Sequence, residues 1–233
     1  MSAKITFLGQ STFLGESDKG KKFYIDPWLE GNPRCPEEYK TPENVDLILL
    51  THGHADHVSD VVNVFNTSNC NVAGPYELVN LLSDEGNFGD KAVPMGKGGN
   101  INLDGLEITL THAMHSSSYN GEYSGEPCGI IMKFENGKTL YHAGDTNVFG
   151  DMKIISELYS PDLCLLPIGS RFTMDGKEAA LATELLSAKK VVPIHFKTFP
   201  LLTGTSEQYE EEIKKRGLST QITVLEPGES IEI

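Results

Sequence analysis

Short apolar or alternating segments recur along this chain, and turn-forming residues separate them. These segments predict β-strands at residues 5–8, 23–25, 45–50, 106–110, 130–134, 139–141, 163–166, 191–194 and 222–225. Helical spacing of apolar residues predicts helices at residues 60–65, 76–82, 177–188 and 206–216. The last helix has Thr205 or Ser206 as its N-cap and acidic residues in its early turns. The pattern therefore indicates a strand-rich chain in which helices interleave with strands from end to end.

The length and the apolar content favour one globular domain spanning residues 1–233. The chain has 233 residues, of which 39% are hydrophobic, and this is enough for one large core. The glycine-rich stretches 31–36 and 96–100 have the composition of loops between strands, so neither needs to be a domain linker. Residues 116–127 form the longest stretch without periodicity, and they directly follow a histidine. Such a loop often borders an active site, although a solvated connector is the commoner meaning.

The sequence predicts neither a membrane segment nor a disulfide framework. No apolar run approaches the roughly 20 residues needed to cross a bilayer, and the N-terminus lacks the pattern of a secretion signal. We therefore expect a cytoplasmic protein without a membrane partner. The cysteines lie far apart with no CxxC pairing, which favours reduced thiols. They are Cys35, Cys70, Cys128 and Cys164.

The net charge argues against a nucleic-acid partner. Nineteen basic residues face 33 acidic ones, so the formal charge of −14 repels polyanions over the surface as a whole. A small-molecule substrate fits this surface better. Because bound cations would neutralise some of the carboxylates, a cleft that holds metal could still accept a small anion.

The candidate chemistry is concentrated in the segment Thr51-His52-Gly53-His54-Ala55-Asp56-His57. Imidazole and carboxylate groups are the ligands of zinc and similar ions, and several must converge on each ion. In an extended segment, residues two apart point the same way, so His52 and His54 are expected to bind one ion. Asp56 and His57, at the turn into a following helix, are expected to reach a second ion. The alternative is a polar loop with accidental histidines.

Other histidine segments are expected to supply the rest of each ion's ligands. His112 and His115 are three residues apart and would face opposite sides of a strand, so at most one is a ligand. His115 is the better candidate because it precedes the loop, whereas His112 fits a packed or rim position. Asp145 follows a strand and a glycine and is expected to bridge two cations. His195 ends an apolar strand and completes the second site, while His142 fits either a proton donor or a hydrogen-bonded structural histidine.

The chain resembles the metallo-β-lactamase superfamily, whose members share an HxHxDH loop, a distant histidine, a bridging aspartate and a final histidine. Within it, the chain is similar to metal-dependent hydrolases related to ascorbate-6-phosphate lactonases. The similarity spans nearly the whole chain, and its motifs are Ile25-Asp26-Pro27-Trp28, Ala113-Met114-His115-Ser116, His142-Ala143-Gly144-Asp145-Thr146, Phe172-Thr173-Met174 and Pro193-Ile194-His195.

This resemblance implies an α/β fold of the αββα type, in which two mixed β-sheets pack face to face with helices outside. It also implies a dinuclear site at one edge of the sheets. Because the lactonase relatives assemble, the resemblance leaves a homo-oligomer open. Two positions depart from the pattern: Gln10 replaces a frequent histidine, and Ser170-Arg171 replaces a small glycine.

The predicted mechanism uses water rather than a side chain as the nucleophile. Two divalent ions roughly 3.5–4 Å apart lower the pKa of bound water from about 15.7 toward about 7, and the resulting hydroxide attacks a carbonyl or phosphoryl centre. Asp145 sets the spacing of the ions. Asp56 is both a ligand and a possible proton acceptor, and Asp26 is expected to support the histidine loop by hydrogen bonds.

Two roles in this mechanism stay open at the level of sequence. A leaving group that departs as an alkoxide needs a proton, and His142, Lys197 or Tyr119 is a candidate donor. Arg171 or Lys197 could clamp an anionic group of the substrate, although a lone cation on a loop is usually a solvated surface charge.

The function predicted from these residues is hydrolysis of a small lactone, ester or phosphoester by a dinuclear metal enzyme. Zinc is the first expectation for the two divalent ions, manganese is the next, and ferrous iron also fits. The alternatives are a nuclease or phosphodiesterase with the same ligand set, a non-hydrolytic di-iron redox protein, and a metal-binding protein without turnover.

Overall fold

Two mixed β-sheets of seven strands each pack face to face at the centre of the molecule. The computed structural model describes residues 2–233. In spatial order, the first sheet contains β16 (Ser230–Glu232), β1 (Lys4–Phe7), β2 (Phe13–Glu16), β3 (Lys22–Ile25), β4 (Leu47–Leu49), β5 (Asn71–Pro75) and β6 (Ala92–Met95). The second sheet contains β15 (Gln221–Ile222), β14 (Lys190–Ile194), β13 (Leu163–Pro167), β12 (Thr139–His142), β11 (Cys128–Lys133), β8 (Leu106–His112) and β7 (Asn100–Leu103).

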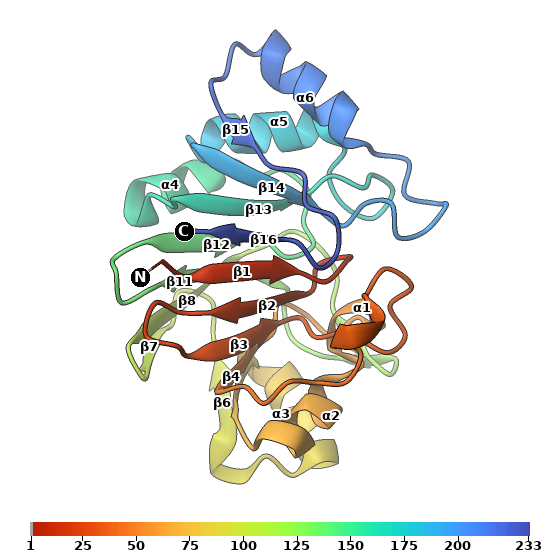
Figure 1. The fold of residues 1–233 in the computed structure, drawn as a ribbon, viewed down its shortest axis with the longest axis vertical. Helices are drawn as coiled ribbons and strands as arrows, with labels where there is room; N and C mark the ends of the chain where they lie inside the picture. Colours follow the sequence, from red (N-terminus) through yellow and green to blue (C-terminus); the bar gives the residue numbers. More distant parts are fainter. Residues whose placement is uncertain (1) are drawn as a thin grey trace.

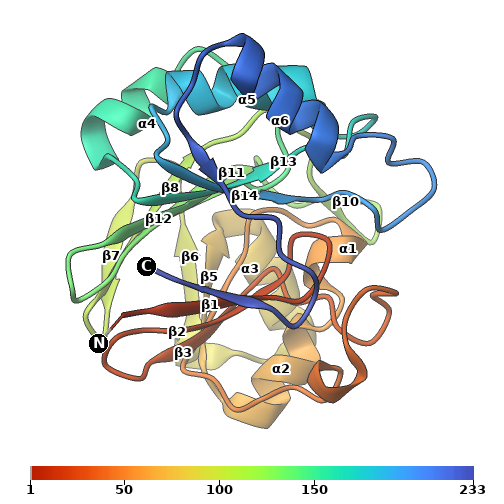
Figure 2. The same ribbon diagram turned by 45° about the horizontal axis from the view of Figure 1, so that its top comes forward.

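Helices cover the outer face of each sheet (Figures 1 and 2). The first sheet carries α2 (Val61–Ser68) and α3 (Tyr76–Gly86), and the second carries α4 (Met152–Tyr159), α5 (Gly176–Leu185) and α6 (Ser206–Lys215). The smaller elements are α1 (Ala55–Val58), the hairpin β9 (Ser118–Tyr119) with β10 (Glu122–Tyr123), and 3₁₀ turns at Glu37–Tyr39 and Gly89–Lys91. This order of layers is the predicted αββα sandwich. Among residues 2–233, no helix has the length and apolar character needed to cross a membrane.

The central strands are buried on both faces, which explains their continuous apolar runs. On β4, Leu47 and Leu49 face the core between the sheets, whereas Ile48 packs under α2 and α3. On β13, Leu165 faces the same central core and Leu166 packs under α4, α5 and α6. Because successive side chains of a strand point to opposite faces, such strands need apolar residues at every position.

Each strand predicted from the pattern overlaps a strand of the structure, and each predicted helix overlaps a helix. The capping box of α6 uses Thr205, whose side chain accepts from Gln208 N. The prediction of residues 222–225 as a strand was wrong after Ile222, where β15 ends. The strands and α-helices absent from the sequence prediction are β2, β5, β6, β7, β16, the hairpin β9–β10, and the helices α1 and α4.

Two of the missed strands contain residues that normally weaken a strand. A Cβ atom on Gly15 of β2 would lie 2.1 Å from the Phe23 ring, so the glycine makes room for that ring on β3. Pro94 lies in β6, which is the edge strand of the first sheet. An edge strand tolerates a missing N–H donor, whereas a central strand does not. Tertiary packing thus outweighs local preference at both places.

The carboxyl ends of β3, β4, β8, β12 and β14 reach the same edge of the sandwich. In the first sheet, β3 and β4 run parallel. In the second sheet, β12, β13 and β14 run parallel, and β8 has the same direction because both β8 and β12 are antiparallel to β11. Loops that follow these strands therefore meet along one rim, as the resemblance implied.

Candidate metal centre

The segment 52–57 starts just beyond β4 and is clamped from two sides. On one side, the carboxylate of Asp26 accepts from Thr51 N at 2.8 Å and from Thr51 Oγ1 at 2.5 Å. On the other side, Gly53 N donates to Ser117 Oγ at 3.1 Å. A Cβ on Gly53 would lie 2.3 Å from Ser124 Oγ, so only glycine allows this close approach. The predicted loop 116–127 thus packs directly on the histidine segment.

The first group of potential ligands consists of three histidines. Nitrogen atoms of His52, His54 and His115 lie within 4.8 Å of one another. His52 Nε2 is 2.9 Å from His54 Nδ1, and His115 Nε2 is 3.3 Å from the same atom. Burial lowers the pKa of each of these imidazoles. They therefore favour the neutral form, which is the form that binds metal.

The second group combines a carboxylate with two buried imidazoles. Ligand atoms of Asp56, His57 and His195 lie within 4.8 Å of one another. Burial alone would lower the pKa of both histidines, but the carboxylate of Asp145 and its neighbours outweigh burial. They raise the pKa of His57 well above its ordinary value and that of His195 to about 9. The carboxylates of Asp26, Asp56 and Asp145 thus strongly favour a positive charge near His57.

Asp145 lies between the two groups. Its Oδ2 is 3.0 Å from His195 Nε2 and 3.7 Å from His115 Nε2, while its Oδ1 is 3.4 Å from His57 Nε2. Burial would raise the pKa of this carboxyl, but His195 and His57 hold it well below its usual range. Within residues 2–233, neither Asp145 Oδ1 nor His57 Nε2 has a hydrogen-bond partner. Buried polar atoms are rarely left unpaired, so these two atoms point to a ligand.

A third grouping, of Asp26, His52 and His57, has the spacing of a metal site but a different chemistry. The carboxylate of Asp26 already accepts from Thr51, and His57 Nδ1 donates to its Oδ2 at 2.7 Å. Because this carboxylate is engaged by protein donors, it orients the histidine loop rather than offering a lone pair to an ion. Its hydrogen bonds to the loop agree with the role expected from the sequence.

Gln10 is a site residue to which the sequence assigned no role. Gln10 and His195 both have a left-handed backbone, with φ of 55° each, and His195 N donates to Gln10 O at 2.7 Å. The side-chain Nε2 of Gln10 donates to Asp56 Oδ2 at 2.8 Å and lies 2.8 Å from His195 Nε2. Such a backbone costs about 1–3 kcal/mol in a non-glycine residue and is found at functional sites. The signal in the sequence was the replacement of a frequent histidine by glutamine.

Two histidines lie apart from these groups. His142 is completely buried, its Nε2 donates to Ser11 O at 3.0 Å, and its Nδ1 accepts from Gly144 N at 3.0 Å. Because the main chain engages both ring nitrogens, this geometry favours the structural alternative over the proton donor. His112 is exposed at the end of β8, with its Nδ1 3.1 Å from Lys97 Nζ, so it occupies a rim position.

The other candidates for proton donor or anion clamp also point elsewhere. The hydroxyl of Tyr119 donates to Glu85 on α3. Lys197 Nζ lies 3.5 Å from Glu226 Oε1, and the guanidinium of Arg171 lies 5.5 Å above the ring of Phe172.

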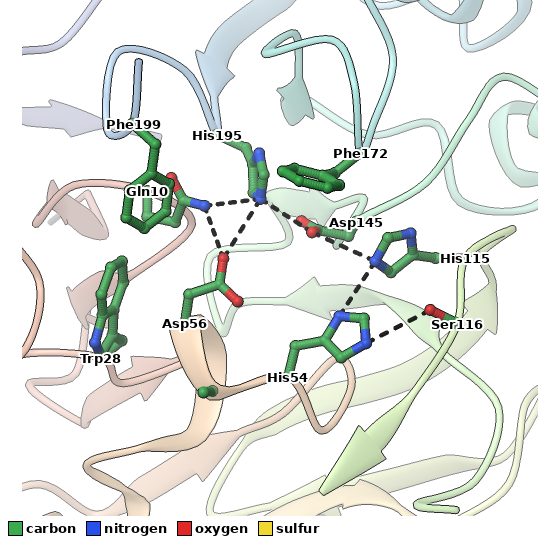
Figure 3. Close-up of a pocket in the computed structure, with 11 residues that line it drawn as sticks. Gln10, Trp28, His54, Asp56, His115, Ser116, Asp145, Phe172, His195 and Phe199 are labelled. Carbon is green, nitrogen blue, oxygen red and sulfur yellow. Dashed lines mark hydrogen bonds and ion pairs between the residues drawn. The ribbon is translucent and has the colours of Figure 1, made fainter. Parts of the chain in front are cut away.

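A cavity of about 480 Å³ opens above the metal-ligand candidates. His54, Asp56, His115, Asp145 and His195 reach its surface. Aromatic rings form much of the remaining wall, and Figure 3 shows Trp28 and Phe199 together on one side of the polar groups and Phe172 next to His195. In the sequence, Trp28 and Phe172 stood out only as members of the motifs that carry the resemblance, and Phe199 carried no signal.

Comparisons with known proteins relate this chain to a family of similar sequences and structures. A family model described as "Beta-lactamase superfamily domain" matches residues 21–196. A UPF0173 metal-dependent hydrolase of Rubrobacter xylanophilus is 43% identical, with 98% of this chain and 96% of the relative covered. A relative with the same description from Methanosarcina barkeri is 42% identical, with 100% of both chains covered.

Among solved structures, Igni18, a metallo hydrolase from the archaeon Ignicoccus hospitalis, superimposes with a TM-score of 0.88. It is 36% identical, and the match covers 100% of this chain and 99% of that chain. These names do not point specifically to ascorbate-6-phosphate lactonases, so that narrower resemblance stays a prediction.

Proposed function

This chain belongs to the metallo-β-lactamase superfamily and is a metal-dependent hydrolase, and on that premise we propose that it uses two divalent ions to hydrolyse a small lactone, ester or phosphoester. The first ion is assigned to His52, His54 and His115. The second is assigned to the group that contains Asp56 and His195. Zinc is the ion that we propose first, followed by manganese and ferrous iron.

The observation that carries this proposal is the position of Asp145 between two separate ligand groups. One of its oxygen atoms lies near His115 of the first group, and both lie near histidines of the second group. A single carboxylate in contact with both groups is the arrangement that a shared, bridging ligand requires. In addition, Oδ1 of Asp145 and Nε2 of His57 are buried and have no hydrogen-bond partner in residues 2–233, so both atoms are available as metal ligands.

The chemical type of the ligand atoms also suits divalent ions. Imidazole nitrogen and carboxylate oxygen suit zinc, manganese and iron, and cysteine is absent from both groups of ligand candidates in the described chain. Ions held there would polarise a substrate oxygen and lower the pKa of the water that binds to them. We therefore assign the nucleophile to water.

The protein's own groups orient this chemistry. Asp26 fixes the tautomer of His57, because its carboxylate can only accept and therefore holds the proton on Nδ1. Asp56 lines the cavity, and Gln10 Nε2 donates to one of its oxygens, so its orientation is fixed. We assign to Asp56 the acceptance of a proton from the attacking water and its transfer to the leaving group.

The test combines elemental analysis with hydrolysis of a panel of lactones, carboxylic esters and phosphodiesters. We expect about two ions per chain and metal-dependent turnover in the purified protein. Asp145→Asn should bind fewer ions and lose roughly 100-fold or more of the activity, since outer partners of metal ligands alone are worth 10–100-fold. Asp162→Asn, on a carboxylate that binds Lys138 and Thr139 on another part of the sandwich, is the matched control.

Each alternative has its own outcome in this experiment. One ion per chain would remove the dinuclear assignment, and activity that survives both chelation and Asp145→Asn would remove the metal mechanism. Turnover confined to phosphodiesters, together with salt-dependent RNA binding, would favour a nuclease. Two irons with consumption of oxygen would favour a redox protein, and metal without turnover of any compound would favour a binding role.

A further inference from the structure

Aromatic side chains line the cavity beside the metal-ligand candidates and indicate which substrates it can accept. Trp28 is nearly buried, and its ring stacks on that of Phe199 with centroids 5.9 Å apart and an interplanar angle of 29°. Phe172 lines the same cavity next to His195 (Figure 3). Phe172 is 50% exposed and Phe199 is 36% exposed, so both rings present open faces or edges at the mouth.

Aromatic side chains that stay exposed at a cavity mouth are suited to a second ring. Burial of one such ring against an apolar surface strengthens binding by roughly 10- to 100-fold. Offset-stacked and edge-to-face contacts add specificity for a flat group. The cavity, of about 480 Å³, has room for one small ring beside the reacting group.

The positive charges that would recognise an anion point away from this space. In the described part of the chain, neither Lys nor Arg is among the residues that line the cavity. Lys197 Nζ lies 3.5 Å from Glu226 Oε1 and 5.4 Å from the centroid of the Phe196 ring. The guanidinium of Arg171 lies over the ring of Phe172 instead of forming the two-pronged contact that arginine makes with phosphate.

The charges that do reach the cavity are the metal-ligand candidates. The negative charges of Asp56 and Asp145 are offset there by His195 and by the ions that these residues would hold. An anionic group placed away from the metal ligands would lie against aromatic rings, with no lysine or arginine to offset the loss of its hydration.

We propose that the natural substrate of this site is an uncharged carboxylic ester or lactone that carries a flat apolar ring. The ring lies against Trp28, Phe172 and Phe199, and the carbonyl group lies over Asp56, His195 and Asp145. This inference rests on the proposed hydrolase function and narrows its substrate class. It excludes substrates that need a phosphate or carboxylate group for recognition.

Trp28 provides a binding assay that is independent of turnover. It is the single tryptophan of the chain, so the intrinsic tryptophan fluorescence of the protein reports on this wall alone. We would titrate the metal-containing protein with acetanilide, a neutral aryl amide that resists hydrolysis, and with 4-acetamidobenzenesulfonate, which adds one negative charge to the same ring. We expect acetanilide to change the fluorescence at concentrations at least ten-fold lower than the sulfonate.

A matched pair of substrates tests the same inference by turnover. Benzyl acetate and ethyl acetate both release an alcohol, but only the first carries a ring. We expect kcat/KM to be at least ten-fold higher for benzyl acetate. Phe172→Ala and Phe199→Ala should lower kcat/KM for benzyl acetate about ten-fold more than for ethyl acetate. Leu201→Ala is the control, because Leu201 is exposed close to Phe199 in sequence but does not line the cavity.

The possible results separate this inference from the proposed function. Equal or tighter binding of the sulfonate, or equal kcat/KM for the two acetates, would overturn the substrate class while metal-dependent hydrolysis still stood. A fluorescence change with acetanilide but no hydrolysis of any ester would overturn the hydrolase assignment and retain the recognition of a neutral ring. Ring selectivity in both assays would support the two proposals together.

Discussion

His57 Nδ1 donates a hydrogen bond to Asp26 Oδ2 over 2.7 Å, and both side chains are completely buried. A carboxylate can only accept, so this contact keeps a proton on Nδ1, and Nε2 is the nitrogen whose proton a bound cation would displace. That Nε2 atom is one of the buried atoms without a partner in residues 2–233. The pair therefore prepares His57 for a cation before any ion arrives.

Asp26→Asn should weaken metal binding by roughly 10- to 100-fold, which is the usual effect of losing an outer partner of a metal ligand. The amide that replaces the carboxylate can donate to Nδ1 and so favours the tautomer with the proton on Nε2. Asparagine tolerates the left-handed backbone of residue 26, which has φ of 47°, so the fold should survive. Competition with a chromophoric chelator measures the affinity. Unchanged affinity for both ions would show that Asp26 acts only on folding.

The packing of the two sheets predicts a strong dependence of stability on Leu165. This side chain is fully buried in the core between the sheets, on the interior strand β13. Leu165→Ala should therefore cost about 2–5 kcal/mol of unfolding free energy, through lost burial and a cavity. Leu158→Ala is the matched control, because Leu158 is 67% exposed on α4 and its loss should change stability by less than about 0.5 kcal/mol. Urea denaturation measures both variants, and equal costs would contradict the layered core.

The convergence of the metal-ligand candidates could largely be predicted from the sequence, because these residues lie at or just beyond the ends of strands with clear patterns. Asp26 follows β3, His52 follows β4, and His195 follows β14. Parallel neighbours end at the same edge, so such residues meet once the strands are correctly identified. The three-residue spacing likewise distinguished His115, which reaches the cavity, from His112, which lies at the rim.

The cavity wall could not be predicted in the same way, because loops carry it. Phe172 follows Ser170 and Arg171, which both have a left-handed backbone, and Phe199 follows Lys197, which has one too. Such conformations are rare for these residue types and have no local sequence signal. Tertiary contacts impose them: a Cβ on Gly169, for example, would lie 1.9 Å from His195 O. The assignment of ligands to two ions, the cytoplasmic location and a homo-oligomer stay predictions.

Gln10 should affect turnover through Asp56 rather than through folding. Gln10→Gly removes the amide that donates to Asp56 Oδ2 and also relieves the strain of φ 55°. Because a hydrogen bond to a charged group is worth about 1.5–3 kcal/mol, we expect kcat to fall by roughly 10- to 100-fold. Asn87→Gly provides the control, since Asn87 has a similar φ of 52° at the end of α3. Both variants should remain as stable as the parent within about 1 kcal/mol. If Gln10→Gly retains full kcat, the amide does not orient Asp56.

The buried histidines predict opposite pH dependences of stability in chelator-treated and zinc-loaded protein. Burial lowers the pKa values of His52, His54 and His115, so the unfolded state binds more protons than the folded state below about pH 6.5. Stability therefore rises with pH up to that point. Against burial, the nearby carboxylates raise the pKa of His195 from 6.5 to about 9. The folded state then keeps a proton that the unfolded state releases, so stability falls as the pH rises from 6.5 through 9.

The chelator-treated protein should consequently be most stable near pH 6.5. By pH 9, its free energy of unfolding should fall by on the order of 3 kcal/mol through His195 alone. This loss corresponds to the shift of the His195 pKa from 6.5 to about 9. In excess zinc, the trend above pH 6.5 should reverse, because protons compete with the ion for His195 and His57 and this competition weakens as the pH rises. Urea midpoints measured from about pH 5.5 to pH 9, with chelator and with zinc, give both curves. His195→Gln should make both curves flatter above pH 6.5. A urea midpoint of the chelator-treated protein that keeps rising to pH 9 would contradict the charged state assigned to His195.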